Sequence, residues 1–231
     1  MAWRPPLPDL GARLRSLRRR GPRRGLQTAV SIVEDVLFDR RHGVETRQRV
    51  EPGAAGPVLG EHAAHGRACH STRVRHFRTL MATLALPPGL GFLDYGAGKG
   101  RVLMLAAGYP FTRVVGVEYA PALCQQAERN LDRFRASSGC VTAIQLVQAD
   151  AAGFEVDPDL HVFYLANPFD EVVQGRVLER VRASLRRHPR PAWLIGNKTR
   201  LDGLVEAAGM FRLHLRLSYG NADFHAWHHP G

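Results

Sequence analysis

The residues most able to do chemistry stand in a glycine-rich stretch, Phe92 to Gly100. A short apolar segment leads into Asp94, and glycines follow at positions 96, 98 and 100. Glycine lets the backbone turn sharply and lets a ligand approach without a Cβ in the way. A helix-compatible run, 101–107, follows at once, and such a turn places a ligand beside a helix N-terminus. The sequence therefore predicts a cofactor-binding turn at the carboxyl end of a strand.

The glycine spacing discriminates between cofactors. A dinucleotide fingerprint, G-x-G-x-x-G, would put its third glycine at position 101, which is Arg101. The arrangement found, with an acid two residues before the first glycine, resembles the first motif of class I S-adenosylmethionine-dependent methyltransferases. A glycine-rich turn in another α/β protein is the alternative. The resemblance implies these cofactor contacts: Asp94, Gly96, Ala97, Gly98 and Gly100.

Two further acids follow strand-like segments. Segment 113–117 ends in Glu118, 20 residues after Gly98, which is the distance at which an acid reaches ribose hydroxyls. Segment 143–148 leads to Asp150. In the family that Asp94 and its glycines resemble, an acid here accepts a hydrogen bond from the adenine amino group. The alternatives are a solvated Glu118 and an Asp150 that caps a turn or helix.

A fourth apolar strand ends in Asn167, Pro168 and Phe169. This ending resembles the motif after the fourth strand in amino-group methyltransferases, although the fuller motif has two prolines. The resemblance implies that a side-chain and a backbone carbonyl accept hydrogen bonds from a substrate amine, with the aromatic ring against it. Such groups orient the nitrogen for in-line displacement, which is a positioning effect. A simple strand-to-loop terminator is the alternative.

The surrounding pattern predicts the elements that position these residues. From residue 91 onward apolar segments alternate with helical ones, which is typical of a parallel sheet wrapped by helices. Helices are predicted over 121–135 and 171–187, and a fifth strand over 192–195. Segments 211–217 and 224–227 flank a Gly-Asn turn and predict an antiparallel hairpin. The resemblance, over about residues 70–229, implies an α/β, Rossmann-like class I methyltransferase fold with a mostly parallel seven-stranded sheet and a C-terminal antiparallel hairpin.

Three regions are predicted along the chain. Residues 1–25 carry a net charge of +7 out of the chain's +11 and form a basic, disordered extension that could make weak contact with nucleic acid. Leucines 10, 14 and 17 could form a short amphipathic helix there, confined by prolines. Residues 26–89 form a helical cap or lid, and residues 90–231 the S-adenosylmethionine-binding domain.

Within the cap, helices are predicted over 28–38 and from Ser71 or Thr72 to Leu86, with a linker at 52–60. Either Ser71 or Thr72 is a good N-cap. Because methyltransferases often use such a preceding segment as a lid, Thr72 is also a candidate cofactor contact.

Composition excludes several other classes. No apolar run approaches the ~20 residues that span a bilayer. The three cysteines form no C-x-x-C pair, which indicates a reduced, cytoplasmic setting. Neither histidine cluster has a zinc spacing, so no metal is predicted. These clusters are His62, His65, Cys69 and His70, and His225, His228 and His229.

Two function classes remain. The first is an active methyltransferase that uses S-adenosyl-L-methionine and transfers a methyl group to an amino nitrogen of an unidentified acceptor, whether protein, nucleic acid or small molecule. Gly116, Val117 and Glu118, with Asn167, give a likeness to the disruptor-of-silencing type of histone lysine methyltransferase. The second is a non-catalytic cofactor- or nucleic-acid-binding module with the same fold.

Overall fold

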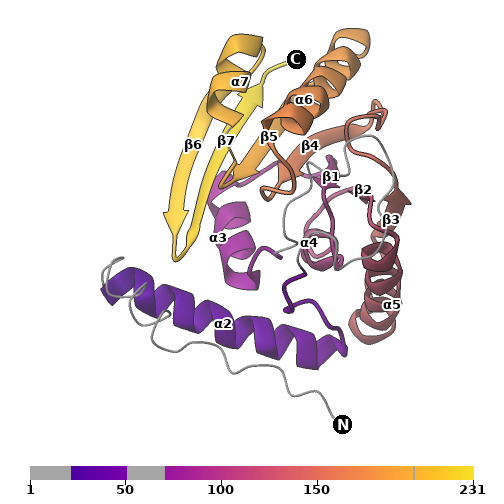
Figure 1. The fold of residues 1–231 in the computed structure, drawn as a ribbon, viewed down its shortest axis with the longest axis vertical. Helices are drawn as coiled ribbons and strands as arrows, with labels where there is room; N and C mark the ends of the chain where they lie inside the picture. The colour runs from indigo at the N-terminus through magenta and orange to yellow at the C-terminus, as the bar shows by residue number, and fades with distance from the viewer. Residues whose placement is uncertain (1–21, 51–70, 200) are drawn as a thin grey trace.

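A seven-stranded sheet forms the centre of the protein (Figure 1). The computed structural model describes residues 22–50, 71–199 and 201–231. Within these residues the strands are β1 Gly91–Tyr95, β2 Arg113–Glu118, β3 Ala143–Gln148, β4 Leu160–Leu165, β5 Ala192–Asn197, β6 Arg212–Tyr219 and β7 Ala222–His229. Their order is β3-β2-β1-β4-β5-β7-β6. Strands β3 to β5 in that order are parallel, whereas β7 is antiparallel to both neighbours. The predicted α/β fold is confirmed.

The direction of strand addition reverses between β1 and β4. The chain builds β2 and β3 on one side of β1, then returns to place β4 and β5 on the other side. In parallel sheets, ligands bind outside the carboxyl ends of the strands at such a switch point. The glycine stretch follows β1, and Asn167 follows β4. The topology therefore brings the two main predicted motifs to one edge of the sheet.

Helices cover both faces of this sheet (Figure 1). They are α2 Pro22–His42, α3 Val74–Leu84, α4 Arg101–Ala106, α5 Pro121–Ser138, α6 Glu171–Arg187 and α7 Leu201–Ala208. Along β4, Val162 and Tyr164 join one core cluster, to which α3, α4 and α5 contribute. Phe163 and Leu165 join the other, with α6 and α7. Because successive strand side chains point to opposite faces, a strand buried on both faces is continuously apolar.

The two helices before the sheet differ from their predicted bounds. Helix α2 is longer than the predicted 28–38, so the last four residues of the predicted disordered extension are helical. Helix α3 begins at Val74, and neither Ser71 nor Thr72 caps it. Instead Asp35 of α2 accepts a hydrogen bond from the Val74 N–H at 2.9 Å. The prediction was wrong because a cap supplied by a distant element leaves no local sequence signal.

Other differences concern ends and connections. Helix α3 stops at Leu84, where Ala85 adopts a left-handed conformation, and α5 continues to Ser138. The predicted hairpin is confirmed as β6 and β7, with Gly220 at φ +59° in its turn.

Some predictions fall on residues that the structure does not describe. They concern residues 1–21, the linker at 52–60 and the first histidine cluster. In the described residues no helix is both long and apolar enough to cross a membrane.

Candidate cofactor and acceptor site

The glycine loop is held against the end of β2. The N–H groups of Gly96 and Ala97 both donate to the carbonyl of Val117, at 2.8 and 3.0 Å. The three glycines have φ values of +77°, +54° and +83°. Side chains other than glycine rarely adopt this left-handed region. The alternating glycines are therefore required by the loop's backbone, as the sequence predicted.

Gly96 also joins the two predicted motifs. A Cβ at this position would lie 2.2 Å from the Cβ of Pro168. The first glycine thus lets the turn after β1 pack directly against the turn after β4. The sequence could not show this contact, because the two residues are 72 positions apart.

Replacing Gly96 with alanine is expected to disrupt this packing. The added methyl group would overlap Pro168, and the residue would be strained at φ +77°. We expect a loss of about 2 kcal/mol or more of unfolding free energy, measured by urea denaturation. Gly153→Ala is a matched control, because a Cβ there would meet only an ordinary contact at 3.8 Å. Equal stability of the two variants would contradict the close approach.

Glu118 is buried and holds the loop together. One carboxylate oxygen accepts from the Gly98 N–H at 2.8 Å, and the other accepts from Tyr119 and Ala120. Burial raises the pKa of Glu118, whereas these three N–H groups act in the opposite direction. A carboxylate offers about four acceptor positions, so one remains for a ligand hydroxyl. The alternative of a solvated Glu118 is excluded, since the residue is 4% exposed.

Asp94 lies inside the sheet, next to the glycine loop that follows it. The residue is 2% exposed. Burial, and secondarily the negative charge of Glu118, raise the pKa of Asp94 to about 8. A carboxyl group with so high a pKa is unfavourable in its ionised form unless a cation lies near it. The site therefore offers a buried acid that a positively charged ligand group would ionise.

Thr72 belongs to a hydrogen-bonded cluster at the end of β4. Its hydroxyl lies 2.7 Å from the hydroxyl of Tyr164, and both residues are buried. A hydrogen bond with Asn197, at the end of β5, acts on Tyr164 as well. The negative charge of Asp94 also contributes to raising the pKa of Tyr164, after the larger effect of burial. Thr72 thus reaches the carboxyl edge of the sheet, although it is not the helix cap that its sequence suggested.

Asp150 follows β3 at the same edge. Its carboxylate accepts a hydrogen bond from the Ala152 N–H at 2.9 Å and so caps a turn. The N–H of the preceding Ala149 donates to the carbonyl of Glu118 at 3.0 Å. The turn-cap alternative is therefore realised in this structure, and a contact between Asp150 and adenine stays a prediction.

The turn after β4 is shaped by Asn167, which has φ +54°. Asn is one of the few residues that tolerate this region. Phe169 is 7% exposed and belongs to the core cluster shared with α6, and its carbonyl accepts from Gln174. Its ring thus anchors the turn from inside, while its contact with an acceptor stays a prediction. The side chain of Asn167 is half-buried at the edge.

Residues that the sequence analysis did not assign also surround the loop. The ammonium of Lys99 donates to the carbonyl of Gln48 at 3.0 Å, and the residue is 6% exposed. Val50 packs against Ala120 and Leu123 at the end of β2. The segment before residue 51 therefore borders the glycine loop. Among these residues, only Lys99 was distinctive in the sequence, because the chain has just two lysines.

Arg101, the first residue of α4, is a buried charge that the sequence analysis missed. Its Nε donates to the hydroxyl of Thr46 at 2.7 Å, and Nη1 and Nη2 lie 3.3 and 3.6 Å from Asp35 and Asp39. A positive charge at a helix N-terminus is unfavourable because of the helix dipole. An arginine at the start of a predicted helix could therefore have indicated that nearby acids stabilise it. This network joins α2 to the helix that follows the glycine loop.

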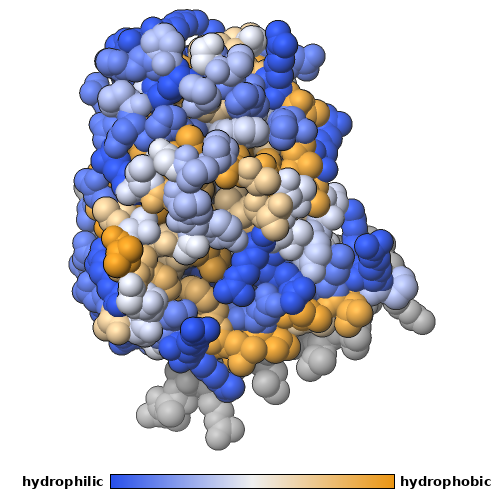
Figure 2. Space-filling view, turned by 180° about the vertical axis from the view of Figure 1, so that it is seen from behind, coloured by the Kyte–Doolittle hydropathy of each residue, from blue (hydrophilic) through white to orange (hydrophobic). Residues whose placement is uncertain are grey.

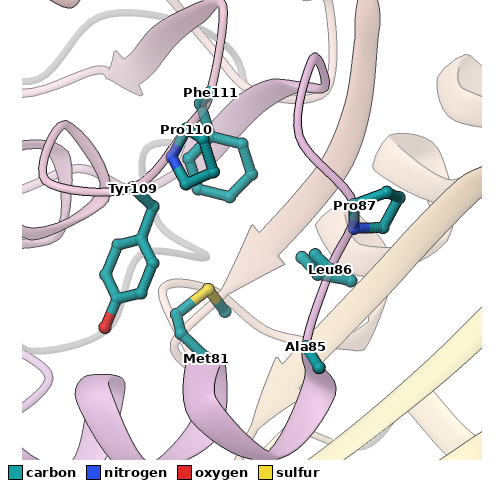
Figure 3. A pocket seen from close by; sticks show the side chains of 7 residues that line it. All are labelled: Met81, Ala85, Leu86, Pro87, Tyr109, Pro110 and Phe111. Atoms are coloured by element: carbon teal, nitrogen blue, oxygen red, sulfur yellow. The ribbon is translucent and has the colours of Figure 1, made fainter.

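An apolar cavity of about 180 Å³ lies elsewhere (Figure 3). Its lining comes from the end of α3, the loop after it and the loop before β2, and includes Met81, Leu86 and Phe111. These loops lead into β1 and β2, so the cavity lies at the amino ends of the strands. It is thus on the edge opposite the glycine loop and does not belong to the site.

The part of the chain that the structure describes contains no candidate metal site. No group of three or more His, Cys, Asp or Glu side chains there could hold an ion. Of the second histidine cluster, His225 lies 2.8 Å from Asp202, and His229 lies 2.9 Å from the carbonyl of Met210.

Comparison with known proteins gives matches at the level of structure. No protein-family model and no curated protein matches the chain. An RNA methyltransferase from Salinibacter ruber, in complex with S-adenosyl-L-homocysteine, superposes with a TM-score of 0.51 at 16% identity, covering 69% of this chain and 94% of its own. A ribosomal protein L11 methylase from Lactobacillus delbrueckii subsp. bulgaricus gives 0.51 at 14% identity, covering 68% and 79%. A SAM-dependent methyltransferase from Aquifex aeolicus gives 0.50 at 14%, covering 66% and 88%.

These similarities, together with the strand order and the loop after β1, define the class: the chain has the fold of the class I S-adenosylmethionine-dependent methyltransferases. At such low identity the comparison establishes the fold. A fold of this kind hosts many activities, so the chemistry depends on the residues of the site.

Proposed function

We propose that the protein is an S-adenosyl-L-methionine-dependent methyltransferase that transfers a methyl group to an amino nitrogen. The observation that carries this proposal is the close packing of Gly96 against Pro168, which brings the turn after β1 into contact with the turn after β4. Asp94 and Glu118 lie beside the same loop. A cofactor-binding loop and an acceptor-binding turn in contact are the arrangement that methyl transfer requires.

The donor set fits this cofactor. The methionine end of S-adenosylmethionine carries an ammonium and a sulfonium, and Asp94 is a buried carboxyl that lacks only a cation to favour its ionised form. The remaining acceptor capacity of Glu118 suits a ribose hydroxyl. When bound, the cofactor would supply an electrophilic methyl group, and the leaving group would be the neutral thioether. The acceptor amine would have to reach the site unprotonated, and the proton that its nitrogen releases after methylation would pass to solvent.

The chain's own residues would bind and orient the reactants. Asp94 would hold the ammonium, the N–H groups of the glycine loop would lie along the cofactor, and Glu118 would fix the ribose. Asn167, held at φ +54°, would accept a hydrogen bond from the acceptor amine and direct its lone pair. Such positioning supplies much of the rate in a bimolecular displacement.

The acceptor class is part of the proposal and rests on Asn167, whose amide oxygen accepts hydrogen bonds from N–H groups. By their names, the neighbours with this fold act on RNA in one case and on a ribosomal protein in another. The fold therefore does not choose among acceptors. A lysine side chain of a protein is one candidate, tested by labelling a lysate with radioactive cofactor. The cytoplasmic location and the nucleic-acid contact of the basic extension stay predictions.

Asn167→Ala and Glu118→Ala are expected to separate the two halves of the site. Asn167→Ala should lower kcat by ~10²-fold, and Asn167→Gly, which removes the amide but tolerates φ +54°, should lower it equally while leaving the dissociation constant for the cofactor within about twofold. Glu118→Ala should instead weaken cofactor binding, since it removes a ligand contact and three loop hydrogen bonds. The measurements are calorimetric titration and initial rates with the labelled acceptor. Normal turnover by Asn167→Ala would remove its assigned role.

A direct test of the cofactor is titration of the protein with S-adenosylmethionine by calorimetry. NAD is the control ligand, and Asp94→Ala is the control variant. We expect saturable binding that is absent with NAD and lost in the variant. Absence of binding to the wild type would favour the non-catalytic module with a methyltransferase fold.

A further inference from the structure

Exposed apolar side chains of α2 are one feature of the surface that the site does not explain. Leu26, Val33 and Leu37 are exposed, and Figure 2 shows hydrophobic atoms along the lower edge of the molecule, where α2 runs in Figure 1. The described residues do not show what lies against these side chains. An enclosed polar atom without a partner is more informative, because its chemistry restricts the group that can complete it. One such atom lies at the end of β5.

Asn197, the last residue of β5, carries an enclosed acceptor without a donor. Its Oδ1 atom is buried, and no residue that the structure describes donates a hydrogen bond to it. Such an atom destabilises a folded protein. Native proteins pair nearly all enclosed polar atoms, so an unpaired one points to a donor that arrives with a ligand or as a buried water.

Tyr164 holds the other side of this amide. The amide N–H of Asn197 donates to the hydroxyl oxygen of Tyr164, which is fully buried. The Tyr164 hydroxyl also lies 2.7 Å from the hydroxyl of Thr72. Its proton can therefore go to Thr72 while its oxygen accepts from Asn197. Because the amide nitrogen is engaged in this way, Oδ1 is left for another donor.

The strand register puts Asn197 beside the turn after β4. Gly196 pairs with Leu165, so Asn197 stands one residue short of the level of Asn167 on the neighbouring strand. Neighbouring strands lie about 4.8 Å apart. Asp94, in contrast, lies on β1, which is two strands away from β5. Asn197 is therefore nearer to the proposed position of the acceptor amine than to the proposed position of the cofactor ammonium.

We propose that Asn197 is a second hydrogen-bond acceptor for the amine of the methyl acceptor, and that the two amide oxygens restrict the enzyme to one methyl group per nitrogen. This inference rests on the proposed function. A neutral primary amine has two N–H groups and one lone pair. If Asn167 and Asn197 each accept one N–H, the lone pair is directed toward the methyl group of the cofactor. A hydroxyl acceptor, with one hydrogen, would leave one oxygen unpaired.

The product of the first transfer no longer matches this pair of oxygens. The N–C bond forms as the C–S bond breaks, and the electron pair of the C–S bond goes to the sulfur. The methylated nitrogen then loses one proton to solvent and becomes a secondary amine with a single N–H. Its new methyl group would have to lie against one of the two oxygens. A site built to hydrogen-bond a group discriminates strongly against a ligand that lacks it, so we expect the second transfer to be slower by roughly 10²-fold or more.

Asn197→Leu tests the unpaired oxygen without any acceptor. Leucine has nearly the same shape and no polar atom, so we expect the Tm of the cofactor-free protein to rise by about 2–4 °C. Tyr95→Phe is the matched control and should raise Tm similarly. Its hydroxyl is also buried without a partner among the described residues, but it belongs to the core cluster on the opposite face of the sheet. A lower Tm for Asn197→Leu would mean that Oδ1 is already paired, as with a buried water, and would overturn the inference.

The number of methyl groups on each nitrogen tests the assigned role. The full chain is incubated with a cell lysate and S-adenosylmethionine that carries a trideuterated methyl group, beside the same lysate without the protein. Mass spectrometry of the digested proteins and RNA counts the labels per nitrogen. We expect one label from the wild type and from Tyr95→Phe. Asn197→Leu should label about tenfold more slowly and should produce nitrogens with two labels, because one of the two oxygens is gone.

The outcomes separate this inference from the proposed function. Nitrogens with two or three labels from the wild type would overturn the restriction to one methyl group. Single labels alone from Asn197→Leu, at the rate of the wild type, would remove Asn197 from the site. Both results would leave methyl transfer to nitrogen intact. Labelling of no nitrogen by the wild type would instead overturn the proposed function, and this inference with it.

Discussion

Replacing Arg101 with alanine is expected to destabilise the protein by about 3 kcal/mol, because it removes the buried guanidinium between Asp35 and Asp39 and leaves these acids to Arg73, Arg47 and their hydrogen bonds. Arg101 is 2% exposed, and Asp35 and Asp39 are 3% and 6% exposed. The guanidinium lies between both acids and donates to Thr46. The variant should also bind cofactor more weakly, because α4 follows the glycine loop directly. Urea denaturation measures the first effect and calorimetry the second.

Arg113→Ala is the matched control for this prediction. Arg113 also lies near two aspartates, Asp157 and Asp159, but both of these side chains are more than half exposed. Exposed ion pairs contribute about 0–1 kcal/mol. If both arginine variants lost the same stability, the buried network would not have the role that its geometry implies.

Asp94→Asn is expected to stabilise the cofactor-free protein at alkaline pH while abolishing cofactor binding. The pKa of Asp94 is raised from 3.8 to about 8 by burial and by the charge of Glu118. In the folded protein the carboxyl group of Asp94 therefore stays protonated up to about pH 8, whereas in the unfolded chain it loses its proton near pH 4. The stabilisation from protonated Asp94 is complete below pH 4 and is lost as the pH rises through 8, by up to about 1.4 kcal/mol per pH unit.

Asparagine cannot ionise, so the variant should avoid this loss. The difference in Tm between variant and wild type should grow from pH 4 to pH 9, as measured by calorimetric scans of the cofactor-free proteins. Parallel pH profiles would contradict the raised pKa of Asp94. We also expect cofactor binding by the wild type near pH 7 to release about one proton. The proton comes from Asp94, because the ammonium of the ligand favours the ionised form of that carboxyl group. Titrations in buffers of different ionisation enthalpy measure this release.

The sequence predicted the parallel sheet well because its signals are local. A buried strand such as β4 is continuously apolar, and the loop after β1 needs glycines for its positive φ values. Helix α6 has the predicted bounds, since Asp170 caps it within its own sequence and its apolar residues repeat every four positions. Where the interaction that forms an element lies within a few residues, its signal can be read along the chain.

Contacts between distant segments left no such signal. Helix α3 starts where Asp35 of another helix caps it, so its local candidates, Ser71 and Thr72, misled the prediction. Asp150 caps a turn, and Phe169 packs into the core below the turn that it ends. The orientation of α2 is also a tertiary result, because its buried Asp35 and Asp39 lie close to Arg101 and Thr46, which are distant in the sequence.

By itself, the sequence determined the fold class, the glycine loop after β1 and the acids that follow the strands, because the backbone of a tight turn and the burial of a strand each restrict residue type at fixed spacing. Only the tertiary structure decided that Gly96 meets Pro168, that Arg101 ties α2 to the loop, and that Asp94 is buried enough to hold its proton. These properties depend on distance and solvent exclusion in three dimensions, and neither quantity is encoded at any single position of the chain.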